Sequence, residues 1–424
     1  MTRECDLLII GAGLAGMTAA ARAADKGLSC VVAGNPSSLM FASGLMDYLG
    51  VYPAGNSQVL ETPEEGLADL TRDLPGHIYA VTGHDAVQDS FEFVRGVLAE
   101  AGLAYTLGNG NQMLLTTMGT VKPSFMVPET MAAGVLNENS GNQKLLVAGI
   151  QGLQGFSPVQ VAEGGAEMFG DTRSVQTELP GIQSVVPPQA LAEMMSDPDI
   201  QDRFITQVRP QLKSADLCGV PAVMGGLSCG AVMSRLRDAF GIPVFEIPGG
   251  PPSIPGLRLK QAFESLLATR HIPFLSNMQM ADPVFDGRYF SLSCDQGIEE
   301  VTVRSRGVIL ATGRFFGNGL HARRERVVET LFRLDVVQPN GRNLWHENLF
   351  LAPEGHRINQ AGIRTDDRFR PLDERDRPVY ENLYAVGSIL AWNDWARLKS
   401  GSGAALASAC RAVDAFADSI GGGA

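Results

Sequence analysis

Three glycines near the N-terminus have a spacing that suits contact with a phosphate group. Gly11, Gly13 and Gly16 lie in the stretch CDLLIIGAGLAGMTAAARAADKG, residues 5–27, and follow the pattern G-x-G-x-x-G. In a strand–turn–helix unit, the first glycine permits the tight turn and the second lets a phosphate approach the backbone. The third allows close packing of helix on strand. The free N–H groups of the helix N-terminus then favour a phosphate or pyrophosphate.

The residues around these glycines predict such a unit. Residues 6–10 are apolar and predict a short buried strand, and residues 14–25 predict a helix. A secretion signal is the alternative for an apolar N-terminal stretch. However, Glu4 and Asp6 stand where a signal peptide is basic, and glycines interrupt the apolar run. We therefore expect a nucleotide-binding fold in a cytoplasmic protein.

The second predicted strand departs from the dinucleotide-binding pattern. An Asp or Glu at the end of this strand normally holds an adenosine ribose hydroxyl. Here the strand SCVVAGN, residues 29–35, ends in Ala33, Gly34 and Asn35. The missing carboxylate disfavours ordinary adenine dinucleotide binding.

Composition limits the classes of partner and cofactor. The chain has 424 residues, which predicts two or three domains, and its net charge of −12 argues against nucleic acid as a main partner. The six cysteines are dispersed without a C-x-x-C motif, so the sequence offers neither a redox dithiol nor a local iron–sulfur pattern. The six histidines include no H-x-x-x-H pair, and we predict no metal site.

The remaining pattern predicts an α/β protein. Strands alternate with helices from residue 143 to about residue 250, which predicts a parallel sheet. The short strands between residues 272 and 305 predict an antiparallel meander that leads into GVILATG, residues 307–313. We expect a Rossmann-like FAD/NAD(P)-binding fold with an antiparallel β-meander and an inserted second α/β domain. The predicted boundaries are 1–142 and 256–424 for the two parts of the nucleotide-binding domain, and 143–255 for the insertion.

Several motifs resemble those of known flavoproteins. GAGLAG, the ATG after the meander and the late NLYAVGS before a Gly-rich helix start resemble the two-dinucleotide-binding-domain flavoproteins. The stretches LMFASGLMDYL, VFEIPGGPPSIPGLRLKQAF, LATGRFFGNGL and SGSGAALASA resemble one family more closely, the B subunit of the anaerobic glycerol-3-phosphate dehydrogenase. This resemblance covers essentially the whole chain.

The resemblance implies a flavoprotein subunit of a respiratory enzyme. It implies an FAD-bearing catalytic A subunit and an iron–sulfur, membrane-associated C subunit as partners. It also implies that the complex oxidises sn-glycerol 3-phosphate to dihydroxyacetone phosphate and passes the electrons to a quinone. The expected location is the cytoplasm, with attachment to the inner face of the membrane through a partner. A free-standing flavin-dependent reductase of the fumarate-reductase type and a non-catalytic scaffold with a degenerate flavin pocket are the alternatives.

FMN is the expected flavin, with FAD as the alternative. The wider family places an Asp in a late Gly-Asp pair that holds the flavin ribityl chain, and Ser388 stands there in this sequence. A ligand without the adenosine half needs no ribose carboxylate, which favours FMN.

The candidate site residues are of two kinds. Those expected to bind the flavin are Gly11, Gly13, Gly16, Ser43, Gly44, Thr312, Gly313, Ser388, Gly401 and Gly403. Arg258 and Arg314 are candidates for binding an anionic substrate through their paired N–H donors. Oxidation of a secondary alcohol by hydride transfer needs a base, and the sequence identifies no catalytic residue of this kind. This agrees with substrate chemistry in the A subunit.

Overall fold

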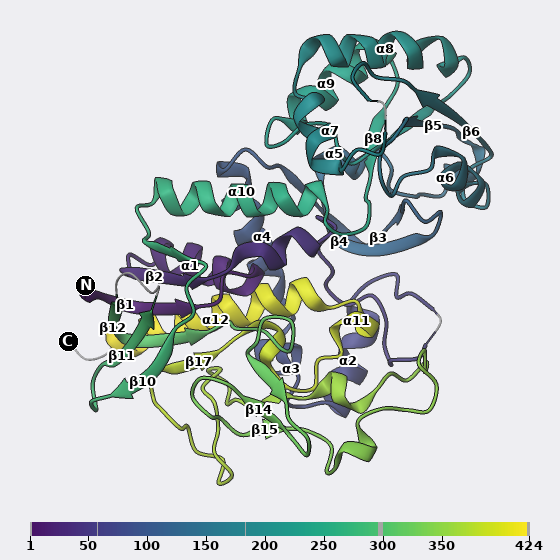
Figure 1. Ribbon diagram of the computed structural model, residues 1–424. Helices are drawn as coiled ribbons and strands as arrows, with labels where there is room; N and C mark the ends of the chain where they lie inside the picture. Colours follow the sequence, from purple (N-terminus) through teal and green to yellow (C-terminus); the bar gives the residue numbers. More distant parts are fainter. Residues whose placement is uncertain (1, 57, 183, 296–299, 422–424) are drawn as a thin grey trace. The chain divides into compact units, whose positions relative to one another are not determined.

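The computed structural model describes residues 2–56, 58–182, 184–295 and 300–421. It consists of two compact units, each assembled from separate stretches of chain (Figure 1). The first unit comprises Met1–Ser38, Asp47–Val97 and Glu264–Ala424, and the second comprises Leu39–Met46 and Leu98–Phe263. The two boundaries near the middle of the chain fall inside helices α4 (His84–Glu100) and α10 (Ile254–Thr269).

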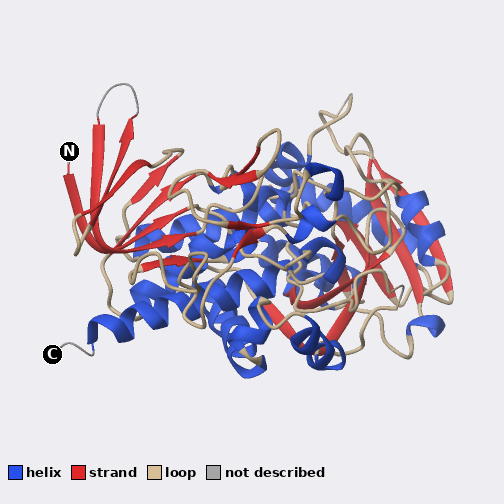
Figure 2. Cartoon of the chain, turned by 90° about the horizontal axis from the view of Figure 1, so that it is seen from below, coloured by secondary structure: helices blue, strands red, loops and turns tan. Residues whose placement is uncertain are grey.

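The first unit is built on a seven-stranded sheet. Its order is β10-β11-β12-β1-β2-β9, and β17 pairs with β12. The ranges are β1 (Thr2–Ile10), β2 (Cys30–Gly34), β9 (Phe274–Ser276), β10 (Ala281–Phe285), β11 (Phe290–Asp295), β12 (Glu300–Leu310) and β17 (Leu383–Ala385). In Figure 2 the meander strands stand side by side next to the N-terminus.

Strand β12 changes partner along its length. Its first half pairs antiparallel with β11, and Val308–Leu310 pair parallel with β17. On the other side β12 pairs parallel with β1 throughout, from Thr302 to Leu310. One strand therefore joins the predicted meander to the parallel sheet, and the carboxyl ends of β2, β1, β12 and β17 lie at one edge of that sheet.

Two alanine-rich helices pack together in the first unit. They are α1 (Leu14–Asp25) and α12 (Gly401–Gly421), whose small side chains allow close approach. Arg22 of α1 makes a paired contact with Asp414 of α12, in which both N···O distances are 2.9 Å. The shorter elements are α2 (Glu64–Asp73), α3 (Ile78–Thr82), α11 (Trp395–Leu398), β13 (Leu320–Ala322), β14 (Val327–Glu329), β15 (Val336–Val337) and β16 (Gly362–Ile363).

The second unit contains a four-stranded parallel sheet. Its order is β6-β5-β7-β8, and an apolar core covers each face. The strands are β5 (Lys144–Ile150), β6 (Asp171–Thr177), β7 (Leu217–Pro221) and β8 (Val244–Ile247). The helices are α6 (Pro158–Gly165), α7 (Pro188–Met194), α8 (Pro198–Leu212) and α9 (Cys229–Phe240). The predicted α/β fold, meander and inserted parallel domain are thus confirmed.

The second unit is larger than the sequence predicted. Residues 98–142, assigned above to the first domain, belong to it as the hairpin β3 (Tyr105–Leu115)–β4 (Val121–Pro128) and the short helix α5 (Glu129–Ala132). Gly134, just after α5, is so close to Phe245 of β8 that an added Cβ would lie 2.1 Å from the ring. The hairpin also pairs with Met46 through Met126. These pairings and contacts are between distant segments, which local sequence patterns do not reveal.

Candidate functional site

Two glycines of the N-terminal motif are required by the packing of the chain on itself. Gly11 follows β1 with φ +113°, and an added Cβ would lie 2.1 Å from the carbonyl oxygen of Ala311. At Gly16 in α1, an added Cβ would lie 1.8 Å from the carbonyl oxygen of Gly11. The predicted strand and helix therefore meet at a distance that no side chain permits. This closeness fixes the tight turn between them.

Gly13 differs from its two neighbours in the motif. An added Cβ there would meet only the hydroxyl of Ser38, at 3.2 Å. Gly13 is half-buried, and as the N-cap of α1 it supplies no side-chain hydrogen bond to the helix. The first turn of an α-helix leaves backbone N–H groups without intrahelical partners. A bare backbone beside such groups fits a phosphate.

The chain becomes less buried at the carboxyl edge of the sheet. The core residues Ile9, Ile309 and Ala385 of β1, β12 and β17 are fully buried. The segments that follow β1 and β12 become half-buried at Gly11 and at 311–314. An accessible edge at the carboxyl ends of parallel strands is where α/β proteins bind ligands.

Gly313 and Ser388 are brought together at this edge. Gly313 follows β12 with φ +70°, and its Cβ position lies 3.5 Å from the Ser388 hydroxyl. Ser388 is half-buried, after Gly387, whose N–H donates to the Ser408 hydroxyl at 2.9 Å. Thr312 turns its hydroxyl towards Gly319, and the Thr312 Oγ1 is buried without a hydrogen-bond partner in the chain.

The start of α12 contains one glycine with a structural role and one that stays accessible. The N–H of Gly403 donates to the carbonyl of Asp47 at 2.8 Å, and an added Cβ would lie 2.5 Å from the Tyr79 Oη. The Gly403 N–H is therefore already engaged and is not available to a flavin. Gly401 is half-buried beside the Trp395 ring. The flavin contact predicted for Gly401 stays a prediction.

The end of β2 has no carboxylate. Asn35 follows the strand, and its Oδ1 accepts a hydrogen bond from the N–H of Ser37 at 2.8 Å. Gly34, with φ +148°, lies so close to the glycine turn that an added Cβ would be 2.9 Å from the Ala12 nitrogen.

The comparisons with known proteins decide the family. The chain matches the FAD binding domain family over residues 6–404. The probable B subunit of the anaerobic glycerol-3-phosphate dehydrogenase of Halobacterium salinarum is 31% identical, over 99% of each chain. The chain belongs to the family of anaerobic glycerol-3-phosphate dehydrogenase B subunits. The B subunit of the Vibrio vulnificus (strain YJ016) enzyme is 26% identical, over 96% of this chain and 95% of that protein.

A solved structure that the chain matches is a 3-ketosteroid Δ1-dehydrogenase from Sterolibacterium denitrificans. It is 15% identical, with a TM-score of 0.47, and the match covers 98% of this chain and 100% of that one. Membership of the FAD binding domain family supports a flavin cofactor. The uncrowded backbone at Gly13 fits the phosphate of such a ligand.

The two arginines predicted to bind substrate bind the protein instead. Arg258 is 1% exposed and makes two hydrogen bonds with the Glu246 carboxylate, at 2.6 and 2.8 Å. Its Nε and Nη2 both donate to the carbonyl of Gly225. The prediction for Arg258 is therefore wrong: the side chain is a buried structural ion pair.

Arg314 is also engaged by the backbone. Its Nη1 donates to the carbonyl of Asn359, and its Nη2 donates to those of Leu390 and Asn393 at 3.0 and 2.9 Å. Burial lowers the pKa of Arg314 to about 10. The predicted bidentate contact of Arg314 with a substrate anion is wrong, because both terminal nitrogens already have acceptors.

Ser43 and Gly44 lie in the second unit. Gly44 has φ +85°, and an added Cβ would lie 2.5 Å from the Pro255 Cβ; its carbonyl accepts from the Tyr105 hydroxyl at 2.8 Å. The Ser43 hydroxyl accepts from Lys122 at 3.5 Å. Packing of the loop explains Gly44, and the flavin contact predicted for the pair stays a prediction.

A buried histidine near the Asn393 side chain was not predicted. His77 is fully buried, and its Nδ1 accepts from the N–H of Tyr79, so the neutral ring carries its proton on Nε2. Burial lowers the pKa of His77 to about 4, and its ring faces the side chain of Asn393. The Asn393 Oδ1 accepts from Ser400, while its Nδ2 is buried without a partner. An isolated histidine gives no sequence signal for such a contact.

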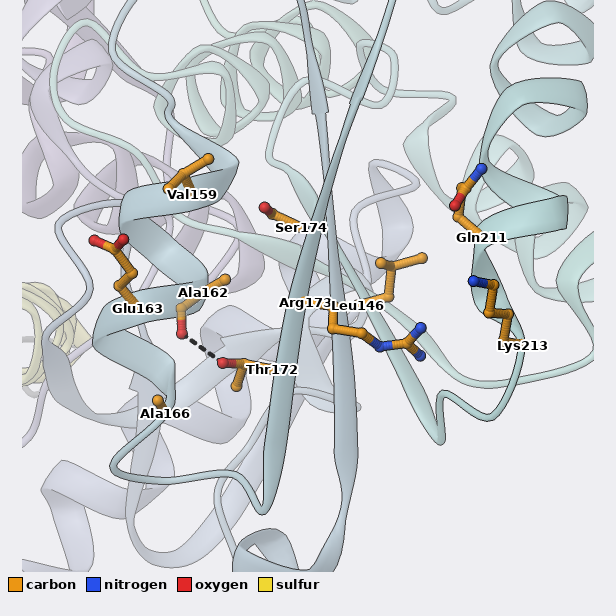
Figure 3. Close-up of a pocket in the computed structure, with 10 residues that line it drawn as sticks. All are labelled: Leu146, Val159, Ala162, Glu163, Ala166, Thr172, Arg173, Ser174, Gln211 and Lys213. Atoms are coloured by element: carbon orange, nitrogen blue, oxygen red, sulfur yellow. Dashed lines mark hydrogen bonds between the residues drawn. The ribbon is translucent and has the colours of Figure 1, made fainter.

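Other features of the described residues do not add a site. A surface depression of about 560 Å³ lies at the edge strand β6 in the second unit, and its side chains flank both faces of that strand (Figure 3). None of the predicted flavin residues lines it. Within the described ranges, no group of three His, Cys, Asp or Glu side chains is placed to hold a metal. No helix among these residues is long and apolar enough to cross a membrane.

Proposed function

We propose that this chain is the flavin-bearing B subunit of a respiratory anaerobic glycerol-3-phosphate dehydrogenase. Its partners are an FAD-bearing catalytic A subunit and an iron–sulfur C subunit at the inner face of the cytoplasmic membrane. The complex removes two electrons and two protons from sn-glycerol 3-phosphate, giving dihydroxyacetone phosphate, and the electrons pass to a quinone. The full-length similarity to proteins named as B subunits carries this proposal.

The chain's own contribution is to bind and orient the flavin. Gly13 and the first turn of α1 hold its phosphate, while Gly313 and Ser388 lie at the adjoining strand ends. Arg314 donates hydrogen bonds to the carbonyls of Leu390 and Asn393 and thereby shapes the loop before α11. A bound flavin supplies the capacity to take up and release electrons, and the protein supplies its position and electrostatic surroundings.

The structure supports a division of labour between the subunits. The Ser38 hydroxyl lies near Gly13, and the Ser388 hydroxyl lies near Gly313. Hydroxyls are weak bases unless another group activates them. We therefore place alcohol oxidation in the A subunit and electron transfer in this chain.

We further propose FMN as the flavin. The family name points to FAD, but β2 ends without the ribose carboxylate, and the Asn35 Oδ1 is already engaged by Ser37. Mass spectrometry of the flavin released from the purified chain tests this choice. FMN is expected, and stoichiometric FAD would contradict it.

Reconstitution tests the function. Reduction of an artificial dye by glycerol 3-phosphate is expected to need the A subunit and to be absent with this chain alone. Dye reduction by the isolated chain at the rate of the complex would favour a free-standing enzyme. A purified chain without bound flavin, in a complex that is still fully active, would favour a scaffold.

A further inference from the structure

One segment of the first unit joins two of the predicted flavin residues. Residues 390–400, which include α11, lie between Ser388 and Gly401, and we call them the α11 segment. Arg314 holds the first part of this segment, because its Nη2 donates to two backbone carbonyls there, at 3.0 and 2.9 Å. The positions of both predicted contacts therefore depend on what holds the α11 segment.

The α11 segment is also held from the side of α3. The Tyr79 Oη donates to the carbonyl of Ser400 at 2.9 Å, and the same carbonyl accepts from the N–H of Ala404 in the first turn of α12. Ser400 is fully buried. An added Cβ at Gly76 would lie 2.4 Å from the Trp392 ring. Gly76 and Tyr79 therefore contact the α11 segment in two places.

His77 lies between these two residues in the chain and faces Asn393. Both side chains are at most 1% exposed. The neutral ring of His77 carries its proton on Nε2, because Nδ1 accepts from the N–H of Tyr79 at 3.1 Å. Neither this Nε2 nor the Nδ2 of Asn393 has a hydrogen-bond partner. Buried polar atoms are nearly always paired, so the two N–H donors need an acceptor.

Rotation of the Asn393 amide satisfies both donors. The oxygen and nitrogen ends of an amide have nearly the same shape. With its oxygen turned towards His77, the amide accepts from the Nε2–H. Its nitrogen then donates to the Ser400 Oγ, which lies 3.0 Å from that end of the amide. A row of hydrogen bonds thus runs from His77 through Asn393 to Ser400.

The first turn of α12 begins directly after this row. Within the described ranges, the N–H groups of Gly401 and Ser402 donate to no protein acceptor, and both residues are half-buried. The start of a 21-residue helix carries a partial positive charge. Held in place, this charge stabilises the added electron density of a reduced flavin more than it stabilises the oxidised flavin.

We propose that His77 is a positioning residue for the flavin, which acts through Asn393 and Ser400 to hold the first turn of α12 towards the flavin. The inference rests on the proposed function, which supplies the flavin, and on the contact predicted for Gly401. His77 itself does not touch the flavin. It raises the reduction potential of the flavin by fixing the helix start.

Two variants break the row from opposite sides. His77→Asn keeps a good N-cap residue for the Tyr79 N–H, but its side chain is too short to reach Asn393. Asn393→Leu removes the amide and keeps a side chain of similar size. His271→Asn is the matched control, because His271 is exposed and has φ +53°, a conformation that asparagine tolerates.

Flavin titration of the full-length chain tests the proposal. The wild type and its variants are freed of flavin and titrated with FMN, and with FAD in parallel. Fluorescence gives the dissociation constant of the oxidised flavin, and an anaerobic titration with redox dyes gives the midpoint potential of the bound flavin. The two values together give the dissociation constant of the reduced flavin.

The variants of the row are expected to favour the oxidised flavin. Both His77→Asn and Asn393→Leu should bind reduced flavin about tenfold more weakly and oxidised flavin less than about threefold more weakly, so the midpoint potential falls. The double variant should show the same shift as either single variant, because one substitution already breaks the row. His271→Asn should keep the wild-type values.

The other results overturn the proposal. Equal weakening of both flavin forms would make His77 a purely structural residue. Wild-type potentials in the folded single variants, or additive shifts in the double variant, would mean that the two side chains do not act together. Loss of the native circular dichroism spectrum in both single variants would make the row a requirement for folding instead.

The titration also separates this inference from the proposed function. A wild-type chain that binds neither FMN nor FAD would contradict both. A wild-type chain that binds flavin, with unchanged values in both single variants, would contradict only the role of His77.

Discussion

At the scale of single residues, the buried ion pair in the second unit makes a clear stability prediction. Replacing Arg258 by Met leaves the Glu246 carboxylate buried without its cation, and the Gly225 carbonyl without its donors. Loss of one partner from a buried pair destabilises a protein by about 3–5 kcal/mol. We expect urea unfolding of Arg258→Met to show a loss of this size.

Two further variants test whether the loss of stability comes from breaking the buried pair or from removing any positive charge. Adding Glu246→Gln to Arg258→Met removes the isolated charge and is expected to restore part of the stability. Arg95→Met removes a cation from the exposed pair with Glu92 and is expected to cost less than about 1 kcal/mol. An equal loss for Arg258→Met and Arg95→Met would refute the structural role of Arg258.

His77 makes stability depend on pH. Its pKa is about 4 in the folded chain because of burial, against 6.5 as the ordinary value. Between these values the unfolded chain binds a proton that the folded chain does not, so the free energy of unfolding falls as the pH falls from about 6.5 to 4. This pKa shift corresponds to a decrease of about 3 kcal/mol in the free energy of unfolding across that pH range.

Chemical unfolding of His77→Gln across pH 4–7 tests this expectation. The substitution keeps an acceptor for the Tyr79 N–H and removes the titrating ring, so the slope should flatten. His321→Gln, at an exposed position, should keep the wild-type slope. Identical slopes for the wild type and His77→Gln would contradict the assignment.

The sequence predicted some of these residues and missed others for physical reasons. The glycine spacing predicted the tight strand-to-helix turn, at which Gly11 and Gly16 leave no room for a side chain. The flavin contact predicted for Gly13 stays a prediction. Arg258 and Arg314 were misassigned because a guanidinium serves equally well for a ligand anion and for buried carbonyls. Burial and partner identity decide between these uses, and both depend on residues far away in the chain.

At the scale of elements, local patterns predicted most strands and helices. The helix expected at 14–25 is α1, and the expected strand 29–35 contains β2. Local patterns did not predict that β12 changes partner along its length. They also did not predict that residues 98–142 belong to the second unit. Both are set by pairings between residues that are distant in sequence.

Two glycines in helices have opposite roles. Gly403 in α12 packs against the Tyr79 hydroxyl, so Gly403→Ala overpacks the core and is expected to destabilise by about 1–3 kcal/mol. Gly96 in α4 is exposed with open space at its Cβ position, so Gly96→Ala is expected to stabilise by about 0.5–1 kcal/mol. Thermal unfolding shows whether each variant is more or less stable than the wild type. A Gly403→Ala variant as stable as the wild type would contradict the close packing.

At the scale of the whole molecule, the proposed flavin lies at the carboxyl edge of the first unit's sheet. The flavin site is the part on which the rest depends.

The most direct test of that site is the flavin content of Gly13→Val, measured per purified chain after release by heat. Gly96→Val, in an exposed helix, is the control for the added side chain. The account predicts a full complement of flavin in the wild type and the Gly96 variant. It predicts loss of most flavin from Gly13→Val with an unchanged circular dichroism spectrum. Full flavin retention in Gly13→Val would contradict the placement of the cofactor at this turn.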